Sequence, residues 1–94
     1  MLLQNKNAVI YGGGGAIGGA VARAFARAGA KVFLAGRTVA RLDAVAREIS
    51  AAEGAVETAQ VDALDEQAVE KHLEAVINQA GRIDISFNAV GFNE

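Results

Sequence analysis

The chain has 94 residues, of which 52% are hydrophobic and 21% charged, a balance that is typical of one small globular domain. Its formal net charge of −2 gives no electrostatic reason to expect nucleic acid or an anionic membrane surface as a partner. With no cysteine and a single histidine, the sequence excludes disulfides and thiolate metal sites, and no metal site is predicted.

The first third of the chain has the pattern of a strand, a helix and a second strand. Residues 7–11 (NAVIY) form a short apolar run that ends at a glycine, as a strand buried on both faces does. Apolar residues then recur at helical spacing, and Gly29 follows them where a helix commonly ends. This apolar stripe consists of Ile17, Val21, Ala24, Phe25 and Ala28. Residues 31–36 (KVFLAG) predict the second strand.

The rest of the chain repeats this alternation. Thr38 and Asp65 are capping residues that predict the starts of two further helices. Their apolar stripes are Leu42, Val45, Ala46 and Ile49 in one helix, and Val69, Leu73, Val76, Ile77 and Ala80 in the other. Residues 55–61 alternate as a strand near the sheet edge does, and residues 82–91 begin a fourth strand.

Strands that alternate with helices through short connections imply parallel strands joined by right-handed helical crossovers. The predicted fold class is therefore α/β, a Rossmann-type doubly wound parallel sheet with the order β-α-β-α-β-α-β. We expect residues 1–94 to be one partial domain of this fold, truncated after the fourth strand. Because such a strand would leave an unpaired edge, the isolated polypeptide is expected to be marginally stable or prone to aggregation.

Six glycines occupy the eight positions 12–19, between the first predicted strand and the first helix. A helix start offers unpaired N–H groups to an anion, and glycines let the backbone approach a diphosphate closely. Gly13, Gly15 and Gly18 satisfy the dinucleotide pattern G-x-G-x-x-G, whereas no lysine followed by Ser or Thr completes a P-loop. A flexible loop without a ligand is the alternative, and the position after a buried strand favours a ligand.

The second predicted strand ends in AGRT, where a dinucleotide site selects its nucleotide. An acid at this point accepts from an unphosphorylated ribose, but no carboxylate occurs before Asp43. Arg37 can instead donate two parallel hydrogen bonds to a 2′-phosphate, and Thr38 can add a hydroxyl. Arg41 can reach over from the next helix, although a solvated surface charge is the favoured interpretation there. The pattern favours NADP(H) over NAD(H) and disfavours FAD.

These residues resemble the N-terminal part of a short-chain dehydrogenase/reductase, from Asn7 to Gly91. The run YGGGGAIG (11–18) is similar to the family's T-G-x-x-x-G-I-G, and its glycine spacing also fits the extended branch, T-G-x-x-G-x-x-G. VDALD (61–65) looks like the segment after the family's third strand, and GRIDISFNAVG (81–91) resembles G-x-I-D-x-x-x-N-N-A-G. These downstream segments favour the commoner, single-domain branch.

The resemblance implies the cofactor half of an NADP(H)-dependent oxidoreductase that moves hydride between nicotinamide and a carbonyl or alcohol carbon of a small molecule. It places the pyrophosphate at Gly12, Gly14, Gly15, Ala16, Ile17 and Gly18, and the 2′-phosphate at Arg37 and Thr38. It places the adenine at Asp62 and Ala63, and the adenosine ribose near Asn88, Ala89, Val90 and Gly91. Mundane alternatives are a turn residue at Asp62 and a strand-end amide at Asn88.

In this family, catalysis uses a serine and a Tyr-x-x-x-Lys pair that lie well beyond the fourth strand. No catalytic residue is therefore predicted among these 94 residues, and the chain alone is expected to be inactive. Tyr11 is expected in the core or a pocket wall, and His72 on a half-exposed helix face. A cytoplasmic location is expected, because four consecutive glycines in the uncharged stretch 8–22 are poor material for a signal helix. The full-length form is expected to be a homo-oligomer.

Two alternatives of other classes stay open. One is a non-catalytic dinucleotide-binding module, which would bind NADPH without turnover. The other is an extended-branch epimerase or dehydratase with tightly held NAD, which would favour an acid at the position of Arg37.

Overall fold

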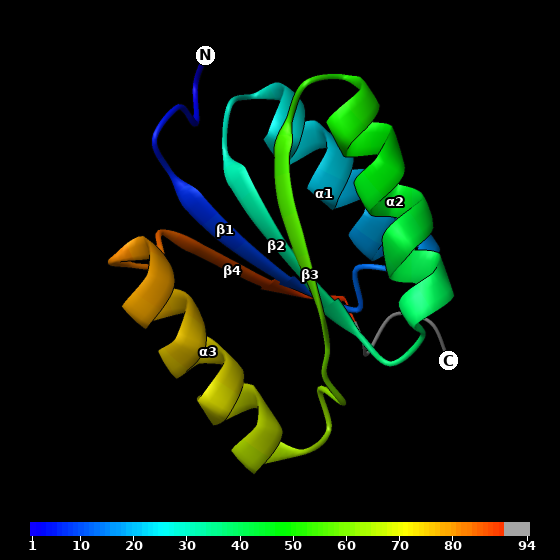
Figure 1. The fold of residues 1–94 in the computed structure, drawn as a ribbon, viewed down its shortest axis with the longest axis vertical. Helices are drawn as coiled ribbons and strands as arrows, with labels where there is room; N and C mark the ends of the chain where they lie inside the picture. Colours follow the sequence, from blue (N-terminus) through cyan, green and yellow to red (C-terminus); the bar gives the residue numbers. More distant parts are fainter. Residues whose placement is uncertain (90–94) are drawn as a thin grey trace.

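The computed structural model describes residues 1–89, and it contains one sheet of four parallel strands connected by three helices (Figure 1). The strands are β1 (Asn7–Tyr11), β2 (Lys31–Gly36), β3 (Ala55–Gln60) and β4 (Ile85–Asn88). The helices are α1 (Ala16–Arg27), α2 (Val39–Ala51) and α3 (Glu66–Ala80). This alternation confirms the predicted Rossmann-type doubly wound fold.

The strands lie in the order β3-β2-β1-β4, so the chain moves outward from β1 to β3 and then crosses to the other side of β1. β3 is an outer strand, as its alternating sequence predicts, and β1 and β2 lie inside the sheet. β4 is shorter than the predicted segment 82–91, of which residues 90 and 91 lie outside the described part of the chain.

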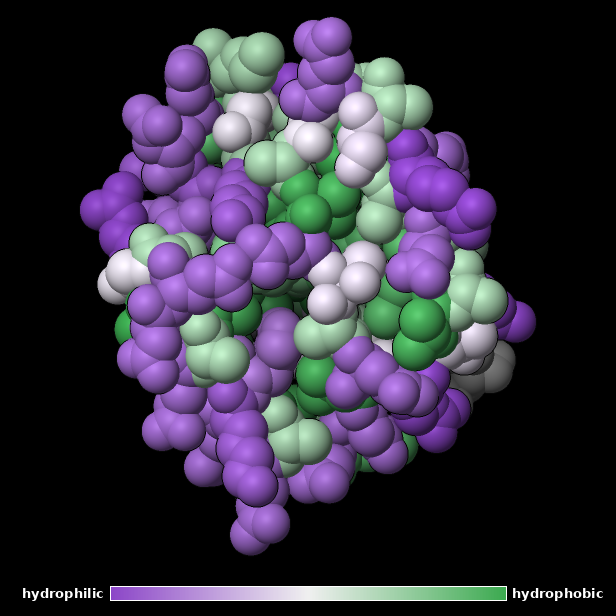
Figure 2. All heavy atoms as spheres, viewed as in Figure 1, coloured by the Kyte–Doolittle hydropathy of each residue, from purple (hydrophilic) through white to green (hydrophobic). Residues whose placement is uncertain are grey.

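Helices cover both faces of the sheet, α1 and α2 on one and α3 on the other (Figure 1). Because side chains alternate between the faces of a strand, β1 and β2 supply both hydrophobic clusters. Ile10 and Leu34 belong to the cluster beneath α1 and α2, whereas Val9, Tyr11 and Phe33 belong to the cluster beneath α3. On the face drawn in Figure 2, hydrophilic residues predominate around the rim and hydrophobic residues show between them nearer the middle.

The face of α1 that packs on the sheet differs from the predicted apolar stripe. Ile17 is 40% exposed and Ala24 is also exposed, whereas Gly18, Gly19 and Ala22 are buried. Glycine and alanine let the helix axis approach its neighbours closely, which hydropathy alone does not reveal. Two predicted stripe residues on α1, Val21 and Phe25, do pack against the core. On α3 the stripe is likewise only partly correct, because Ile77 is 46% exposed.

The helix ends follow the capping residues with one exception. Asp65 accepts hydrogen bonds from the N–H groups of Gln67 and Ala68, as a capping aspartate does. Gly29 adopts a φ of 101°, a left-handed value that favours glycine just after a helix. Thr38 stands at the N-cap position of α2, but its side chain makes no capping hydrogen bond.

A polar cluster joins the amino ends of β1 and β4. The carboxylate of Asp84 accepts from the backbone N–H of Asn7 at 2.8 Å, and its other oxygen lies 3.0 Å from Nε of Arg82. The side chain of Asn7 donates to the carbonyl of Arg82 at 3.0 Å. The hydrogen bond from Asn7 and the nearby positive charges hold the pKa of Asp84 below its usual range.

This lowered pKa predicts an acid-sensitive contribution to stability. A carboxyl group whose pKa is lower in the folded than in the unfolded protein stabilises the folded state at pH values above its pKa in the unfolded protein. This stabilisation is lost as the pH falls through the pKa of the group in the folded protein. We therefore expect Asp84→Asn to unfold with a shallower dependence on pH than the wild type in the acidic range. Urea unfolding curves at intervals from pH 7 to pH 3 measure this slope. An equal pH dependence of the free energy of unfolding in the two proteins would show that Asp84 does not contribute to it.

Within residues 1–89, no helix combines the length and the apolar character that crossing a bilayer requires.

Candidate functional site

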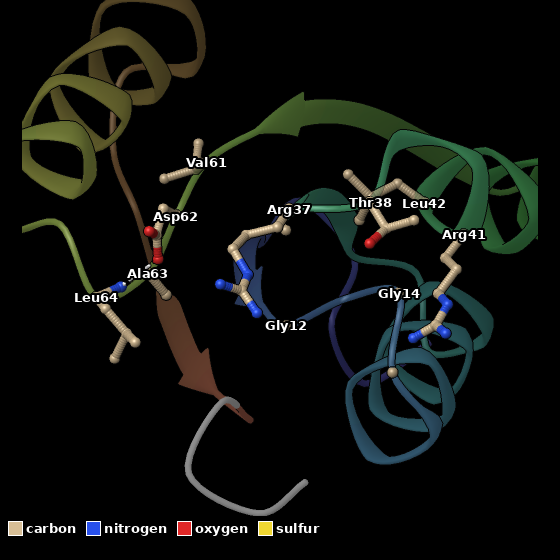
Figure 3. Close-up of a pocket in the computed structure, with 12 residues that line it drawn as sticks. Gly12, Gly14, Arg37, Thr38, Arg41, Leu42, Val61, Asp62, Ala63 and Leu64 are labelled. Atoms are coloured by element: carbon tan, nitrogen blue, oxygen red, sulfur yellow. Dashed lines mark hydrogen bonds between the residues drawn. The ribbon is translucent and has the colours of Figure 1, made fainter. Parts of the chain in front are cut away.

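A cleft of about 290 Å³ opens at the carboxyl ends of β1, β2 and β3 (Figure 3). It is lined by Gly12, Gly14, Gly15, Gly36, Arg37, Thr38, Arg41, Leu42, Val61, Asp62, Ala63 and Leu64. Ligands of doubly wound sheets bind outside the carboxyl ends of the strands, where the strand order reverses. In this sheet the reversal lies at β1, whose last residue directly precedes the glycine loop.

The glycine loop forms the wall of the cleft next to α1. The N–H groups of Gly12 and Gly13 both donate to the carbonyl of Ala35, at 2.9 and 3.1 Å, which holds the turn against β2. Gly12 has a φ of 76°, a conformation that residues with a Cβ rarely adopt. Gly15 is the N-cap of α1, so no side chain caps the helix, and its first turn contains no acidic residue. The first N–H groups of α1 therefore have no partner within the helix and no side-chain cap.

At positions 14 and 18 the chain requires glycine because neighbouring atoms leave no room for a Cβ, and not because of the φ angle. A Cβ on Gly18 would lie 2.1 Å from the carbonyl oxygen of Gly12, so the first turn of α1 packs directly on the loop backbone. A Cβ on Gly14 would lie 2.8 Å from Cβ of Arg41, so the loop also abuts α2. Gly18 is buried and, with Ala16 and Ile17, is not among the residues that line the cleft.

Two arginines enter the cleft from the end of β2 and the start of α2. In Figure 3 the guanidinium of Arg37 extends toward Gly12, and that of Arg41 lies beside Gly14. Arg37 is exposed, and the side-chain amide of Gln60 donates to its carbonyl at 3.1 Å, which links the ends of β2 and β3. No carboxylate among residues 1–89 forms an ion pair with either arginine. Arg41 is exposed, as a solvated surface charge is, and it also lines the cleft.

The segment after β3 forms the opposite wall. Oδ1 of Asp62 accepts from the N–H of Leu64 at 3.0 Å, and its carbonyl accepts from the N–H of Asp65 at 3.0 Å. Asp62 is therefore a turn residue, which was the structural alternative to a binding role, and it also lines the cleft. Leu64 is 76% exposed, so this wall presents an apolar side chain beside a carboxylate.

Of the predicted ribose residues, the structure describes Asn88 and Ala89, and neither of these two is among those lining the cleft. Asn88 ends β4, and the N–H of Ala89 donates to the carbonyl of Tyr11 at 2.9 Å, beside the start of the glycine loop. Ala89 is fully buried. Val90 and Gly91 lie outside the described residues.

One polar pair near the site has no signal in the sequence. The hydroxyl of Tyr11 lies 2.9 Å from Nδ1 of His72, and the rings meet edge to face at 5.5 Å. Tyr11 is 3% exposed and His72 is half-exposed on α3, which confirms the positions expected for both side chains. Burial raises the pKa of Tyr11 and lowers the pKa of His72, so both are neutral at pH 7.

The chain is similar to curated oxidoreductases along nearly its whole length. It is 40% identical over 91 residues to the uncharacterized oxidoreductase UxuB of Bacillus subtilis, covering 97% of this chain and 33% of that protein. It is 38% identical over 91 residues to the meso-2,3-butanediol dehydrogenase of Serratia marcescens, covering 97% of this chain and 36% of the relative. The chain therefore spans about a third of the length of these relatives.

Solved structures of short-chain oxidoreductases share the fold. A metagenomic enzyme in complex with NADP superposes with a TM-score of 0.88 at 36% identity, over 92% of this chain and 39% of that one. A short-chain dehydrogenase/reductase from Serratia marcescens gives a TM-score of 0.89 at 30% identity, over 94% and 36% of the two chains. The family model for short chain dehydrogenase matches residues 6–94. This chain therefore belongs to the short-chain dehydrogenase family.

Proposed function

We propose that this chain is the cofactor-binding part of an NADP(H)-dependent oxidoreductase that transfers hydride between nicotinamide and a carbonyl or alcohol carbon of a small molecule. The observation that carries the proposal is a cleft in which Gly15, the N-cap residue of α1, and Arg37 lie together, with no carboxylate at the end of β2. Family membership supports the reaction class. The related metagenomic enzyme in complex with NADP supports the choice of nucleotide. We propose in addition that the full-length enzyme is homo-oligomeric and cytoplasmic.

The glycine loop fits a diphosphate. The N–H groups at the start of α1 have no side-chain cap, and the helix dipole favours negative charge at that end. Gly14 and Gly15 line the cleft without a Cβ that would stand between a phosphate and the backbone. Gly18 supports this surface from behind by letting α1 pack on Gly12. We assign the diphosphate to the loop from Gly12 to the first turn of α1, which includes Ala16 and Ile17.

The end of β2 fits a 2′-phosphate. A guanidinium can donate two parallel hydrogen bonds to phosphate oxygens, and the geometry leaves Arg37 without a competing ion pair among residues 1–89. Thr38 lines the same cleft, and its hydroxyl is not used to cap α2. Both observations support Arg37 and Thr38 as ligands of the phosphate that distinguishes NADP(H) from NAD(H).

The wall after β3 fits an adenine. Asp62 provides a carboxylate acceptor, and the exposed Leu64 provides an apolar surface beside it. We assign the adenine to Asp62 and Ala63, and the adenosine ribose to the region of Asn88 and Ala89 with Val90 and Gly91. When bound, the nicotinamide supplies the hydride chemistry. The residues of this chain bind and orient the dinucleotide.

Titration with NADPH and with NADH tests the proposal. Hydrogen bonds to charged groups contribute about 1.5–3 kcal/mol, so NADPH is expected to bind about 10- to 100-fold more tightly than NADH. Isothermal titration calorimetry at one salt concentration measures both affinities. A preference for NADH would contradict the assignment of Arg37 and favour the NAD-dependent alternative. Binding of neither nucleotide would contradict the proposal as a whole.

A turnover assay separates the enzyme from a non-catalytic binding module. In the protein as its gene encodes it, we expect NADPH to be oxidised in the presence of a reducible carbonyl compound. Tight NADPH binding with no turnover on a broad panel of carbonyl and alcohol substrates would favour the binding module.

A further inference from the structure

The Tyr11–His72 pair joins elements that carry the two walls of the cleft. Tyr11 is the last residue of β1 and is followed directly by the glycine loop. His72 lies on α3, the helix that begins directly after the wall at Asp62 and Leu64. The 2.9 Å contact between the hydroxyl and Nδ1 therefore connects the strand that precedes the glycine loop to the helix that follows the wall at Asp62 and Leu64.

Apolar packing holds α3 to the sheet, through Val76 in the hydrophobic cluster and Ala68, Val69, Leu73 and Ala80 against it, and side-chain hydrogen bonds between them are few in the described part of the chain. Val76 is the one residue of α3 that is buried, and Ile77 next to it is 46% exposed. Within residues 1–89, two side-chain hydrogen bonds cross from α3 to the sheet. One joins Gln79 to Glu57 on the outer strand β3, and the other joins His72 to Tyr11 on the inner strand β1. Loss of the second would leave α3 tied by a side-chain hydrogen bond only to the sheet edge.

The aromatic ring of Tyr11 also belongs to the packing beneath the second wall. It lies in the same hydrophobic cluster as Val61, and Ala63 packs against that cluster. Val61 and Ala63 both line the cleft. A shift of the Tyr11 ring or of α3 would therefore be transmitted to the surface assigned to the adenine.

We propose that Tyr11 and His72 are positioning residues for the dinucleotide, whose hydrogen bond sets the separation between the glycine loop and the wall at Asp62 and Ala63. The inference rests on the proposed function, because a dinucleotide must contact both walls at once. A bond that holds the walls at the required spacing before the ligand arrives lowers the cost of ordering the site on binding.

The surroundings of His72 suit a neutral imidazole. Glu57 of β3 and His72 line a second, shallow groove between α3 and the sheet, but the carboxylate of Glu57 is bound by Lys31 at 3.0 Å and by Gln79. The positions one helical turn from His72 hold no acid that would stabilise an imidazolium; they are Ala68, Val69, Ala75 and Val76. The neutral ring has one donor and one acceptor nitrogen. Depending on the tautomer, Nδ1 therefore donates to the hydroxyl of Tyr11 or accepts from it.

Affinity for NADPH in a set of matched variants tests the inference. Tyr11→Phe removes one oxygen, and His72→Leu removes the polar ring nitrogens. A neutral hydrogen bond predicts that each variant binds NADPH about 3- to 10-fold more weakly. The double variant is expected to bind no more weakly than either single one, because the two changes remove the same bond. His72→Asn, which places an amide near the position of Nδ1, is expected to restore most of the affinity.

A structural control comes from the opposite end of the same strand. Asn7→Ala removes the hydrogen bond to the carbonyl of Arg82 and is expected to lower the urea midpoint while leaving NADPH affinity unchanged. All affinities are measured at pH 7.5 and at a temperature where circular dichroism shows every variant folded. If wild type binds NADPH and Tyr11→Phe binds it equally well, the positioning role is overturned while the proposed function stands. If wild type binds neither nucleotide, both are overturned.

Discussion

Replacing Arg37 by aspartate is expected to lower the affinity for NADPH about 100-fold and to raise the affinity for NADH. Removal of the guanidinium abolishes paired, charge-assisted hydrogen bonds to the 2′-phosphate, and the new carboxylate repels that phosphate. The same carboxylate can accept from the unphosphorylated ribose 2′-hydroxyl, as acids at this position do in NAD-binding sites. Calorimetric titration of both nucleotides measures the reversal directly.

A charge-matched control separates this effect from a general electrostatic one. Arg47→Asp makes the same change in charge on α2, at an exposed residue that is not among those lining the cleft. Its NADPH affinity is expected to stay within about twofold of wild type, because this side chain does not line the cleft and salt at about 0.1 M weakens the interactions of exposed charges. If Arg37→Asp retains the NADPH preference of the wild type, the assignment of Arg37 is wrong.

Gly18→Ala is expected both to destabilise the fold and to weaken NADPH binding. The new Cβ would lie 2.1 Å from the carbonyl oxygen of Gly12, a backbone atom that cannot rotate away. Relief of this clash requires α1 to move off the glycine loop, so overpacking should lower the free energy of unfolding by about 1–3 kcal/mol. The displaced N–H groups should also weaken NADPH binding by about tenfold or more, since hydrogen bonds to charged groups depend on alignment.

The neighbouring glycine offers a control on the same helix. A Cβ on Gly19 would approach Cγ2 of Val45 to 3.3 Å, a side-chain contact that a small shift relieves. Both substitutions gain about 1 kcal/mol of helix propensity, so a difference between them reports the clash rather than the propensity. Urea unfolding and NADPH titration of the two variants measure this difference. Near-equal stability and affinity would show that the loop has room for a Cβ at residue 18.

The elements of the fold could be predicted because their local signals agree with one another. The inner strands of a parallel sheet are buried on both faces, so residues 7–11 and 31–36 appear as continuous apolar runs. Asp65 caps its helix in the structure because an aspartate carboxylate can satisfy N–H groups that the helix leaves unpaired. The position of Arg37 in the cleft follows from its place at the end of a strand, since the carboxyl ends of parallel strands share one edge.

The packing of α1 could not be predicted from hydropathy. Gly18 and Gly19 carry no side chain, so a search for apolar stripes selects Ile17 and Ala24 instead, and both of these are exposed. The burial of the two glycines depends on how closely the helix approaches the loop and α2, which is a distance between elements. The place of Arg41 in the cleft lining could not be predicted for the same reason, because its approach to Gly14 arises only when α2 is packed.

The sequence alone determines the alternation of strands and helices and the parallel sheet. It also places the glycines and Arg37 together at the carboxyl ends of the strands. These features depend on burial periodicity, capping and backbone freedom, which are properties of residues close together in the chain. Tertiary structure decided the side-chain bond between Tyr11 and His72, the close contact of Gly18 with Gly12, and the placement of Arg41 beside the loop. Each of these three contacts depends on the distance between packed elements. Tyr11 and His72 are 61 residues apart in the chain, so no local sequence pattern predicts their hydrogen bond.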